Sequence, residues 1–88
     1  MIEGLKDKVA IVTGGGHGIG RTYCMGFGRA GVKVAVADID APAAEAVAAE
    51  VTKESGAEAL ALRLDVADEK STNAMAHATL QRFGRIDI

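Results

Sequence analysis

A glycine-rich segment near the N-terminus limits the possible folds of this chain more than any other feature. Residues 13–20 read Thr-Gly-Gly-Gly-His-Gly-Ile-Gly, so five of the seven residues after the threonine are glycine. Glycine loses more conformational freedom on folding than any other residue, a cost that a simple turn does not need to carry. A turn that binds nothing is the alternative, and this cost disfavours it. We therefore expect the backbone here to turn sharply and to approach another group closely.

The residues on the two sides of the glycines follow different apolar patterns. Residues 8–13 are a short run of apolar and β-branched side chains, which predicts a buried strand. Residues 18–30 have apolar side chains at helical spacing, and Gly31 follows where a helix C-terminal glycine belongs. The apolar positions of this predicted helix are Ile19, Tyr23, Phe27 and Ala30.

Strand and helix patterns continue to alternate along the chain. Residues 32–37 predict a second buried strand, and residues 59–64 predict a third strand. Between them, Pro42 suits the first turn of a helix, and Gly56 ends that helix. The apolar stripe of this second helix comprises Ala44, Val47, Ala48 and Val51.

A third helix and the opening of a further strand complete the pattern. Asp68 is the predicted N-cap of a helix that runs to about Phe83, with Gly84 after it, and residues 86–88 resemble the opening of a fourth strand. This alternation is typical of parallel βαβ units with right-handed crossovers. Because 88 residues make one domain at most, we predict a single α/β domain over residues 1–88. It would be a Rossmann-like, doubly wound parallel sheet, incomplete after the order βαβαβα.

The position of the glycines between the first strand and the first helix indicates what they bind. Ligands of open α/β sheets bind at such turns, and the N–H groups of a helix N-terminus favour an anion. The common dinucleotide fingerprint on Gly14 and Gly16 would need a small residue where Ile19 stands, and no Lys-Ser or Lys-Thr follows as a P-loop requires. The spacing that fits is Thr-Gly-x-x-x-Gly-x-Gly, with its glycines at Gly14, Gly18 and Gly20. We predict a site for a diphosphate.

An acidic residue after the second strand indicates which dinucleotide would bind. Asp38 lies 18 residues beyond Gly20, about where a carboxylate meets the adenosine ribose hydroxyls in dinucleotide sites. The same carboxylate would repel the 2′-phosphate of NADP. Asp40 adds negative charge, and His17 is mostly neutral at pH 7, so the sequence favours NAD over NADP. The alternative is that Asp38 is a solvated turn residue or a helix N-cap.

The end of the third strand offers two more candidate contacts. Asp65 and Val66 lie on the same rim of the predicted sheet as Asp38. Asp65 could accept a hydrogen bond from the adenine amino group, with Val66 bounding the base. Aspartate is also common in turns after strands, and this alternative stays open.

Composition excludes several classes of partner. A formal net charge of −2 gives no surface for nucleic acid, and the apolar runs are too short to cross a membrane. Residues 1–6 show no signal-peptide pattern. With Cys24 as the single cysteine, no internal disulfide can form, so we expect a cytoplasmic protein in which Cys24 is an inert core residue. Neither His17 nor His77 has a further ligand at metal-binding spacing, so we predict no metal site.

Taken together, these residues resemble the N-terminal, cofactor-binding portion of the classical short-chain dehydrogenase/reductase family. The resemblance covers the whole chain, from the first strand and the glycine turn through Leu64-Asp65-Val66 to the segment at residues 82–88. It implies that Thr13 braces the turn and that Gly20 lets the first helix pack closely. The residues implied to bind NAD are Gly14, Gly16, His17, Gly18, Ile19, Gly20, Asp38, Ile39, Asp65 and Val66.

The chain departs from the family pattern in its catalytic residues. The family has an Asn-Asn-Ala-Gly segment after its fourth strand, then a serine, then a Tyr-x-x-x-Lys pair that transfers the proton, and none of these occurs here. The only tyrosine is Tyr23, a predicted packing residue, and Phe27 stands four residues later. We therefore expect no catalytic residue in these 88 residues and no activity from them alone.

Three functions follow as hypotheses. The first is part of an NAD-dependent oxidoreductase that transfers a hydride between nicotinamide and an alcohol or carbonyl substrate, with the chain as a portion of a longer polypeptide. The second is a non-catalytic NAD-binding or interaction module, and the third is an inert truncated fragment. The resemblance also implies a homo-oligomer. It does not identify the substrate, because the family's later loops set substrate specificity.

Overall fold

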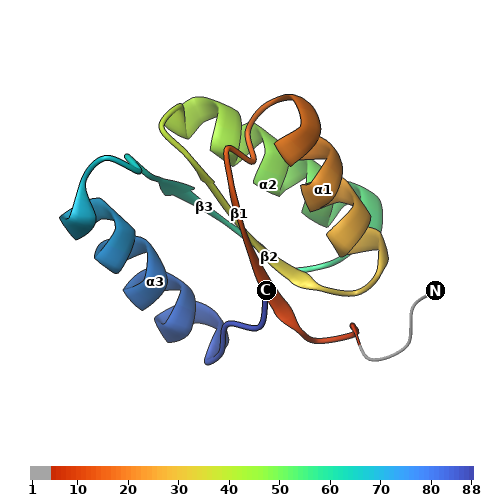
Figure 1. Cartoon of the computed structure of the whole chain (residues 1–88). Coiled ribbons are helices and arrows are strands. Elements are labelled where there is room, and N and C mark those ends of the chain that lie inside the picture. Colours follow the sequence, from red (N-terminus) through yellow and green to blue (C-terminus); the bar gives the residue numbers. More distant parts are fainter. Residues whose placement is uncertain (1–4) are drawn as a thin grey trace.

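The computed structural model describes residues 5–88 (Figure 1). Residues 1–4 lie outside the described residues. Part of the signal-peptide prediction and the start of the predicted domain fall on them. Strands and helices alternate along the chain, which confirms the predicted α/β order. The elements are β1 (Val9–Thr13), α1 (Gly18–Arg29), β2 (Lys33–Asp38), α2 (Ala41–Ser55), β3 (Ala59–Arg63) and α3 (Glu69–Phe83).

The three strands form one parallel sheet in the order β1-β2-β3. Val12 of β1 lies opposite Val36 of β2, and Asp38 at the end of β2 lies opposite Arg63 at the end of β3. Helices α1 and α2 cover one face of the sheet, and α3 lies on the other (Figure 1). Helices on both faces confirm the predicted doubly wound arrangement, and they bring the carboxyl ends of all three strands to one rim.

The core lies between the sheet and the helices α1 and α2. Helix α2 buries the four residues of its predicted apolar stripe against this face, which confirms that part of the sequence pattern. A stripe of small and β-branched side chains lets the helix lie close to the valines of β2, which are also buried. The buried cluster comprises Val12, Cys24, Met25, Val34, Val36, Ala44, Val47, Ala48 and Val51.

Helix α1 packs on a face that agrees only in part with the prediction: Cys24 is buried as expected and Phe27 packs against the core, but two of the predicted apolar positions do not. Ile19 is 71% exposed and Tyr23 is 56% exposed, so the prediction of Tyr23 as a packing residue is wrong. The residues of α1 that are buried are instead Gly20, Cys24, Met25 and Gly28. Gly20 and Gly28 occupy this face because α1 lies too close to the glycine turn and to α2 at these positions for a larger side chain.

The helix ends agree with the sequence signals. Asp68 accepts a hydrogen bond from the N–H of Lys70 and caps α3, and Gly84 ends that helix with a φ of 82°. Gly56 ends α2 in the same left-handed conformation, and Gly31 follows α1 with a φ of 84°. None of the helices in residues 5–88 is both long enough and apolar enough to cross a membrane.

The last residues lie along the free edge of β1. The N–H of Ile88 donates to the carbonyl of Val9 at 3.1 Å, and the N–H of Ile11 donates to the carbonyl of Ile88 at 3.2 Å. These two bonds flank Ala10 as the rungs of a parallel ladder do. Residues 86–88 form no strand in the described part of the chain, but they take the place beside β1 that the predicted fourth strand would occupy.

Candidate functional site

Three segments meet at the carboxyl ends of the strands. They are the glycine turn after β1, the residues that follow β2 and the residues that follow β3. A pocket of about 210 Å³ opens between them. Its lining residues are Gly14, Asp38, Ile39, Leu64, Asp65 and Val66. Five of these six were predicted from the sequence as ligand contacts, so the fold brings together residues that lie up to 52 positions apart.

The glycine turn holds the backbone in conformations that other residues rarely adopt. Gly14 has a φ of 68° and Gly18 a φ of 50°, both in the left-handed region. At Gly20, a β-carbon would lie 2.1 Å from the carbonyl oxygen of Gly14. The three glycines of the Thr-Gly-x-x-x-Gly-x-Gly spacing therefore have structural reasons, two for the turn and one for close approach.

The N-terminus of α1 has no side-chain cap. His17 is its N-cap residue, but the His17 side chain makes no capping hydrogen bond, and no acidic residue stands in the first turn. By contrast, Asp40 caps α2 and Asp68 caps α3. Unsatisfied N–H groups and the positive end of the helix dipole make such an end suited to an anion.

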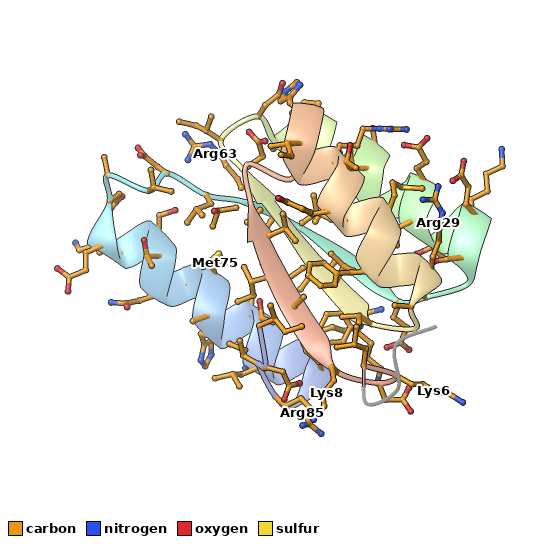
Figure 2. All side chains as sticks on the ribbon, turned by 45° about the vertical axis from the view of Figure 1, so that its right-hand side comes forward. Lys6, Lys8, Arg29, Arg63, Met75 and Arg85 are labelled. Carbon is orange, nitrogen blue, oxygen red and sulfur yellow. The ribbon has the colours of Figure 1, made fainter. Side chains whose placement is uncertain are left out.

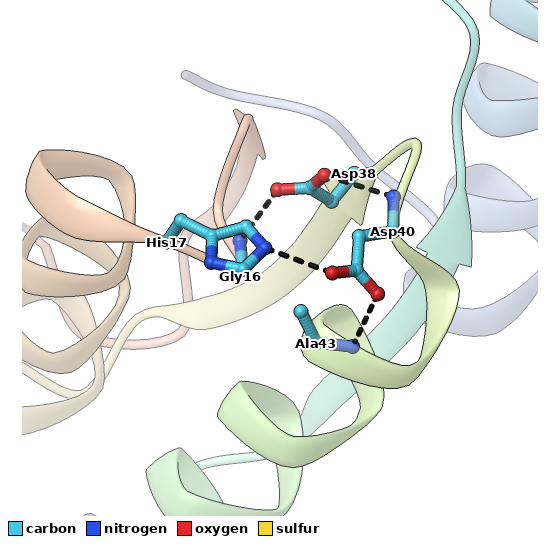
Figure 3. A network of polar contacts seen from close by, with 5 residues as sticks. All are labelled: Gly16, His17, Asp38, Asp40 and Ala43. Carbon is cyan, nitrogen blue, oxygen red and sulfur yellow. Dashed lines mark hydrogen bonds and ion pairs between the residues drawn. The ribbon is translucent and has the colours of Figure 1, made fainter.

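Asp38 fixes the glycine turn against the end of β2. Its side chain is buried, with 7% of the residue exposed, and one carboxylate oxygen accepts a hydrogen bond from the N–H of Gly16 at 3.0 Å (Figure 3). The other oxygen accepts from the N–H of Asp40 at 3.0 Å. Asp38 is therefore neither a solvated turn residue nor a helix N-cap, and the alternative reading of this residue is wrong. The Gly16 N–H is engaged by Asp38, so Gly16 has no free N–H for a ligand.

A second contact joins the turn to the start of α2. The Nε2 atom of His17 lies 3.0 Å from one oxygen of Asp40, and the other oxygen of Asp40 accepts from the N–H of Ala43 at 3.1 Å (Figure 3). The hydrogen bond from Ala43, followed by that from His17, lowers the pKa of the Asp40 carboxyl below its ordinary value. Asp40 is thus a carboxylate at neutral pH.

The far side of the pocket combines turn chemistry with exposed apolar side chains. Asp65 accepts from the N–H of Ala67 at 3.0 Å, so its common role in turns is present here. Ile39 is 60% exposed and Val66 is 76% exposed, and both line the pocket. Exposed aliphatic side chains beside a pocket suit the faces of a flat, apolar ring.

Two charged residues of the site were not identified from the sequence. Asp40 was read only as added negative charge, although its position before Pro42 and a helix pattern is a signal for an N-cap. Arg63 lies opposite Asp38 in the strand register, and Figure 2 shows it at the carboxyl end of the sheet. Strand register cannot be read from one sequence, so nothing local indicated that Arg63 is near Asp38.

Cys24 lies beneath the turn and away from the pocket. It is fully buried, with its Sγ 3.8 Å from the carbonyl oxygen of Gly15. Burial raises the pKa of the Cys24 thiol to about 11. A buried, protonated thiol is a weak nucleophile, in agreement with the prediction of an inert core residue.

Comparison with known proteins gives one consistent result. Residues 8–88 match the family described as short chain dehydrogenase. A sorbitol dehydrogenase of Cereibacter sphaeroides is 43% identical over 84 residues, which are 96% of this chain and 31% of that protein. The chain spans about a third of the length of the curated relatives it matches.

Solved structures of similar sequence share the fold. The crystal structure of a hydroxysteroid dehydrogenase from Escherichia coli superposes with a TM-score of 0.91 at 39% identity, over 96% of this chain and 35% of that one. A 3-ketoacyl-(acyl-carrier-protein) reductase from Brucella melitensis, complexed with NADH, gives a TM-score of 0.86 at 37% identity, over 94% of this chain and 32% of that one.

Proposed function

Because this chain belongs to the short chain dehydrogenase family, we propose that residues 1–88 are the NAD-binding part of an oxidoreductase. One observation carries the proposal. The carboxylate of Asp38 is hydrogen-bonded to the glycine turn, so a group suited to a diphosphate and a group suited to a ribose are held side by side. The bound cofactor would supply hydride transfer to or from an alcohol or carbonyl carbon.

The residues at the rim fit an adenine dinucleotide. The uncapped start of α1, with Gly18, Ile19 and Gly20 in its first turn, would receive the diphosphate. Asp38 would accept hydrogen bonds from the adenosine ribose hydroxyls. The adenine ring would lie in the pocket between Ile39 and Val66, with Asp65 near its amino group.

The charges at the rim support NAD over NADP. Asp38 and Asp40 are two carboxylates at the proposed ribose site, and a 2′-phosphate there would be repelled. Arg63, which lies beside Asp38 in the strand register, carries the opposite charge. The Brucella reductase, a relative of this chain, is complexed with NADH, which supports NAD as the cofactor.

The proton-transfer step of the whole protein needs residues other than these. No Tyr-x-x-x-Lys sequence occurs in the 88 residues, and Tyr23 lies on the exposed face of α1 rather than in the pocket. An unassisted phenol has a pKa near 10 in model compounds and is a poor acid or base at neutral pH. We propose that these residues bind and orient the cofactor, and that the alcohol or carbonyl substrate is bound and converted elsewhere in the polypeptide.

The second candidate function is a non-catalytic NAD-binding module. Such a module would use the same glycine turn and the same hydrogen bond between Asp38 and Gly16. Calorimetric titration with NAD, combined with an assay of alcohol oxidation, separates the two. Binding with turnover by the whole polypeptide that contains these residues supports the oxidoreductase, and binding without turnover by that polypeptide supports the module.

Substitution of Asp38 by alanine tests the cofactor site. We expect NAD affinity to fall by the loss of one or two charge-assisted hydrogen bonds, about 1.5–3 kcal/mol each, and Asp38→Arg should shift preference toward NADP. Asp68→Ala is the matched control, because it removes a carboxylate that caps a helix outside the pocket. Unchanged NAD affinity in folded Asp38→Ala would remove Asp38 from the site.

Location and assembly stay predictions of the sequence. A cytoplasmic location is supported by the single buried thiol of Cys24. A homo-oligomer is supported by family membership alone, and sedimentation of the purified protein would test it.

A further inference from the structure

The side of the pocket that follows β3 is held by hydrogen bonds rather than by packing. We name Asp65 and Val66, which line the pocket there, the outer wall. Leu64, just before them, is buried, but Asp65 is only partly buried and Val66 is 76% exposed. Residues 67 and 68 are exposed as well. Because the outer wall buries little apolar surface, its position depends on its polar contacts.

Asp65 is the centre of these contacts. Its carbonyl accepts from the N–H of Asp68 at 3.0 Å, and one of its carboxylate oxygens accepts from the N–H of Ala67 at 3.0 Å. Both bonds lie within the turn, so they fix the shape of the turn but do not tie it to another element. The N–H of Asp65 makes the third contact, because it donates to the hydroxyl oxygen of Ser71 at 3.0 Å. This bond joins the outer wall to α3.

Ser71 does not use its hydroxyl to cap its own helix. Asp68 is the N-cap residue of α3, so Ser71 is the third residue of the helix. A side chain at this position often reaches back to the N–H of the N-cap residue. In this chain that N–H is bonded to the carbonyl of Asp65, and the Asp68 side chain accepts from Lys70. The Ser71 hydroxyl instead reaches three residues further back, to Asp65.

These contacts leave one atom of the outer wall available to a ligand. The second carboxylate oxygen of Asp65 has no hydrogen-bond partner within residues 5–88. Such an oxygen accepts a hydrogen bond from an amino group and repels a carbonyl oxygen. The bond forms only over a narrow range of distances, about 2.7–3.2 Å between nitrogen and oxygen. A small displacement of Asp65 would therefore break it.

We propose that Ser71 is a positioning residue of the cofactor site, which holds Asp65 where its carboxylate selects a base that carries an amino group. The inference rests on the proposed function, because it assumes that an adenine dinucleotide lies in this pocket. Ser71 is not one of the residues that line the pocket, so it acts through Asp65. Loss of its hydroxyl would weaken the selection of the base more than the binding of the diphosphate.

The test compares two dinucleotides that differ in one group of the base. NAD has the amino group of adenine, and nicotinamide hypoxanthine dinucleotide has a carbonyl oxygen in its place. Calorimetry gives the dissociation constant of each for the whole polypeptide that contains these residues. In Ser71→Ala, we expect NAD affinity to fall by about fivefold, the equivalent of about one hydrogen bond. The affinity for the hypoxanthine dinucleotide should fall less, so the preference for NAD should narrow.

A second variant and a second measurement support the same test. Ser71→Cys keeps nearly the volume of the side chain but replaces the hydroxyl oxygen with sulfur, a weak acceptor. It should narrow the preference for NAD in the same direction, whether or not Ser71→Ala folds. Hydrogen exchange of the Asp65 amide reports on the bond without any ligand. This amide should exchange faster in either variant than in the parent, because its acceptor is lost or weakened.

Two matched controls separate positioning from a general loss of stability. Thr72→Ala removes the next hydroxyl of α3, which donates to the carbonyl of Asp68 at 3.3 Å. Ser55→Ala removes a hydroxyl that accepts from the N–H of Ala57 at 3.2 Å, as Ser71 does from Asp65, but at the end of α2 and outside this pocket. Both controls should keep the parent's preference for NAD over the hypoxanthine dinucleotide.

The outcomes distinguish the inference from the function on which it rests. If the folded Ser71 variants keep the parent's preference, or if a control narrows it equally, the inference is wrong. It is also wrong if the parent binds the two dinucleotides equally well, because Asp65 then selects no base. If the parent binds neither dinucleotide, the proposed function itself fails, which is a different result.

Discussion

Gly20 lies in the first turn of α1 with its α-carbon against the carbonyl group of Gly14. A β-carbon there would lie 2.1 Å from the oxygen and 2.8 Å from the carbon of that group. Because both atoms belong to the backbone of the turn, no side chain can move aside to make room. We expect Gly20→Ala to displace the turn, to destabilise the fold by about 1–3 kcal/mol or more and to weaken NAD binding. Thermal denaturation and NAD titration would check this, and a variant that melts and binds like the parent would contradict it.

Cys24, beneath the same turn, links stability to alkaline pH. Burial raises the pKa of its thiol from 9.0 to about 11. Between these values the unfolded chain loses the thiol proton and the folded chain keeps it, so stability falls as the pH rises. Two pKa units correspond to about 2–3 kcal/mol. Denaturation of the parent and of Cys24→Ala should therefore show the advantage of the parent shrinking from pH 8 toward pH 11. A constant difference would argue against this role of burial.

At the scale of elements, α1 shows that small residues set how closely a helix can pack. Gly26 and Gly28 are two residues apart in α1, but a β-carbon at Gly26 would meet nothing within 4 Å, whereas one at Gly28 would lie 2.7 Å from Cγ1 of Val51. It would also lie 2.8 Å from the hydroxyl of Ser55, which is held by hydrogen bonds to Val51 and Ala57. The two positions form a matched pair.

We expect opposite effects of alanine at these two positions. Gly26→Ala should stabilise the protein by about 0.5–1 kcal/mol, because alanine is the better helix former and no contact is lost. Gly28→Ala should destabilise it by about 1–3 kcal/mol, because α1 and α2 must move apart. Chemical denaturation of both variants would measure the difference. Equal effects would show that α1 and α2 do not pack through Gly28.

The same contrast explains which elements could be predicted from the sequence. The stripe of α2 was predicted because its buried residues, such as Val47 and Val51, are apolar and recur at helical spacing. The packing face of α1 was predicted only in part, because apolar periodicity gives little weight to Gly20 and Gly28, where the closest contacts occur. Glycine spacing and the acid at the end of the second strand predicted two residues that line the pocket, Gly14 and Asp38. The pairing of His17 with Asp40 depends on side-chain geometry across two turns, which one sequence does not encode locally.

At the scale of the whole molecule, the two faces of the sheet are covered unequally. On one face, α2 buries Val47 and Val51 completely or nearly so, together with two alanines. On the other, all residues of α3 are described and Thr79 alone is buried, while Met75 is half-buried. Leu60 of β3 is also half-buried. The stability of α3 therefore depends more on its own caps, Asp68 and Gly84, than on packing.

This asymmetry predicts that α3 opens before the rest of the fold. Burying a valine contributes about 1.5–3 kcal/mol, so opening α2 forfeits two such contributions that opening α3 does not. We expect amide hydrogens of α3 to exchange through local opening at a free energy about 2 kcal/mol or more below that of α2. Native-state hydrogen exchange would measure both helices in one sample. Met75→Ala should lower protection in α3 and leave α2 unchanged, because Met75 belongs to the α3 side of the sheet alone. Equal protection of the two helices would mean that α3 is coupled to the core more strongly than its burial indicates.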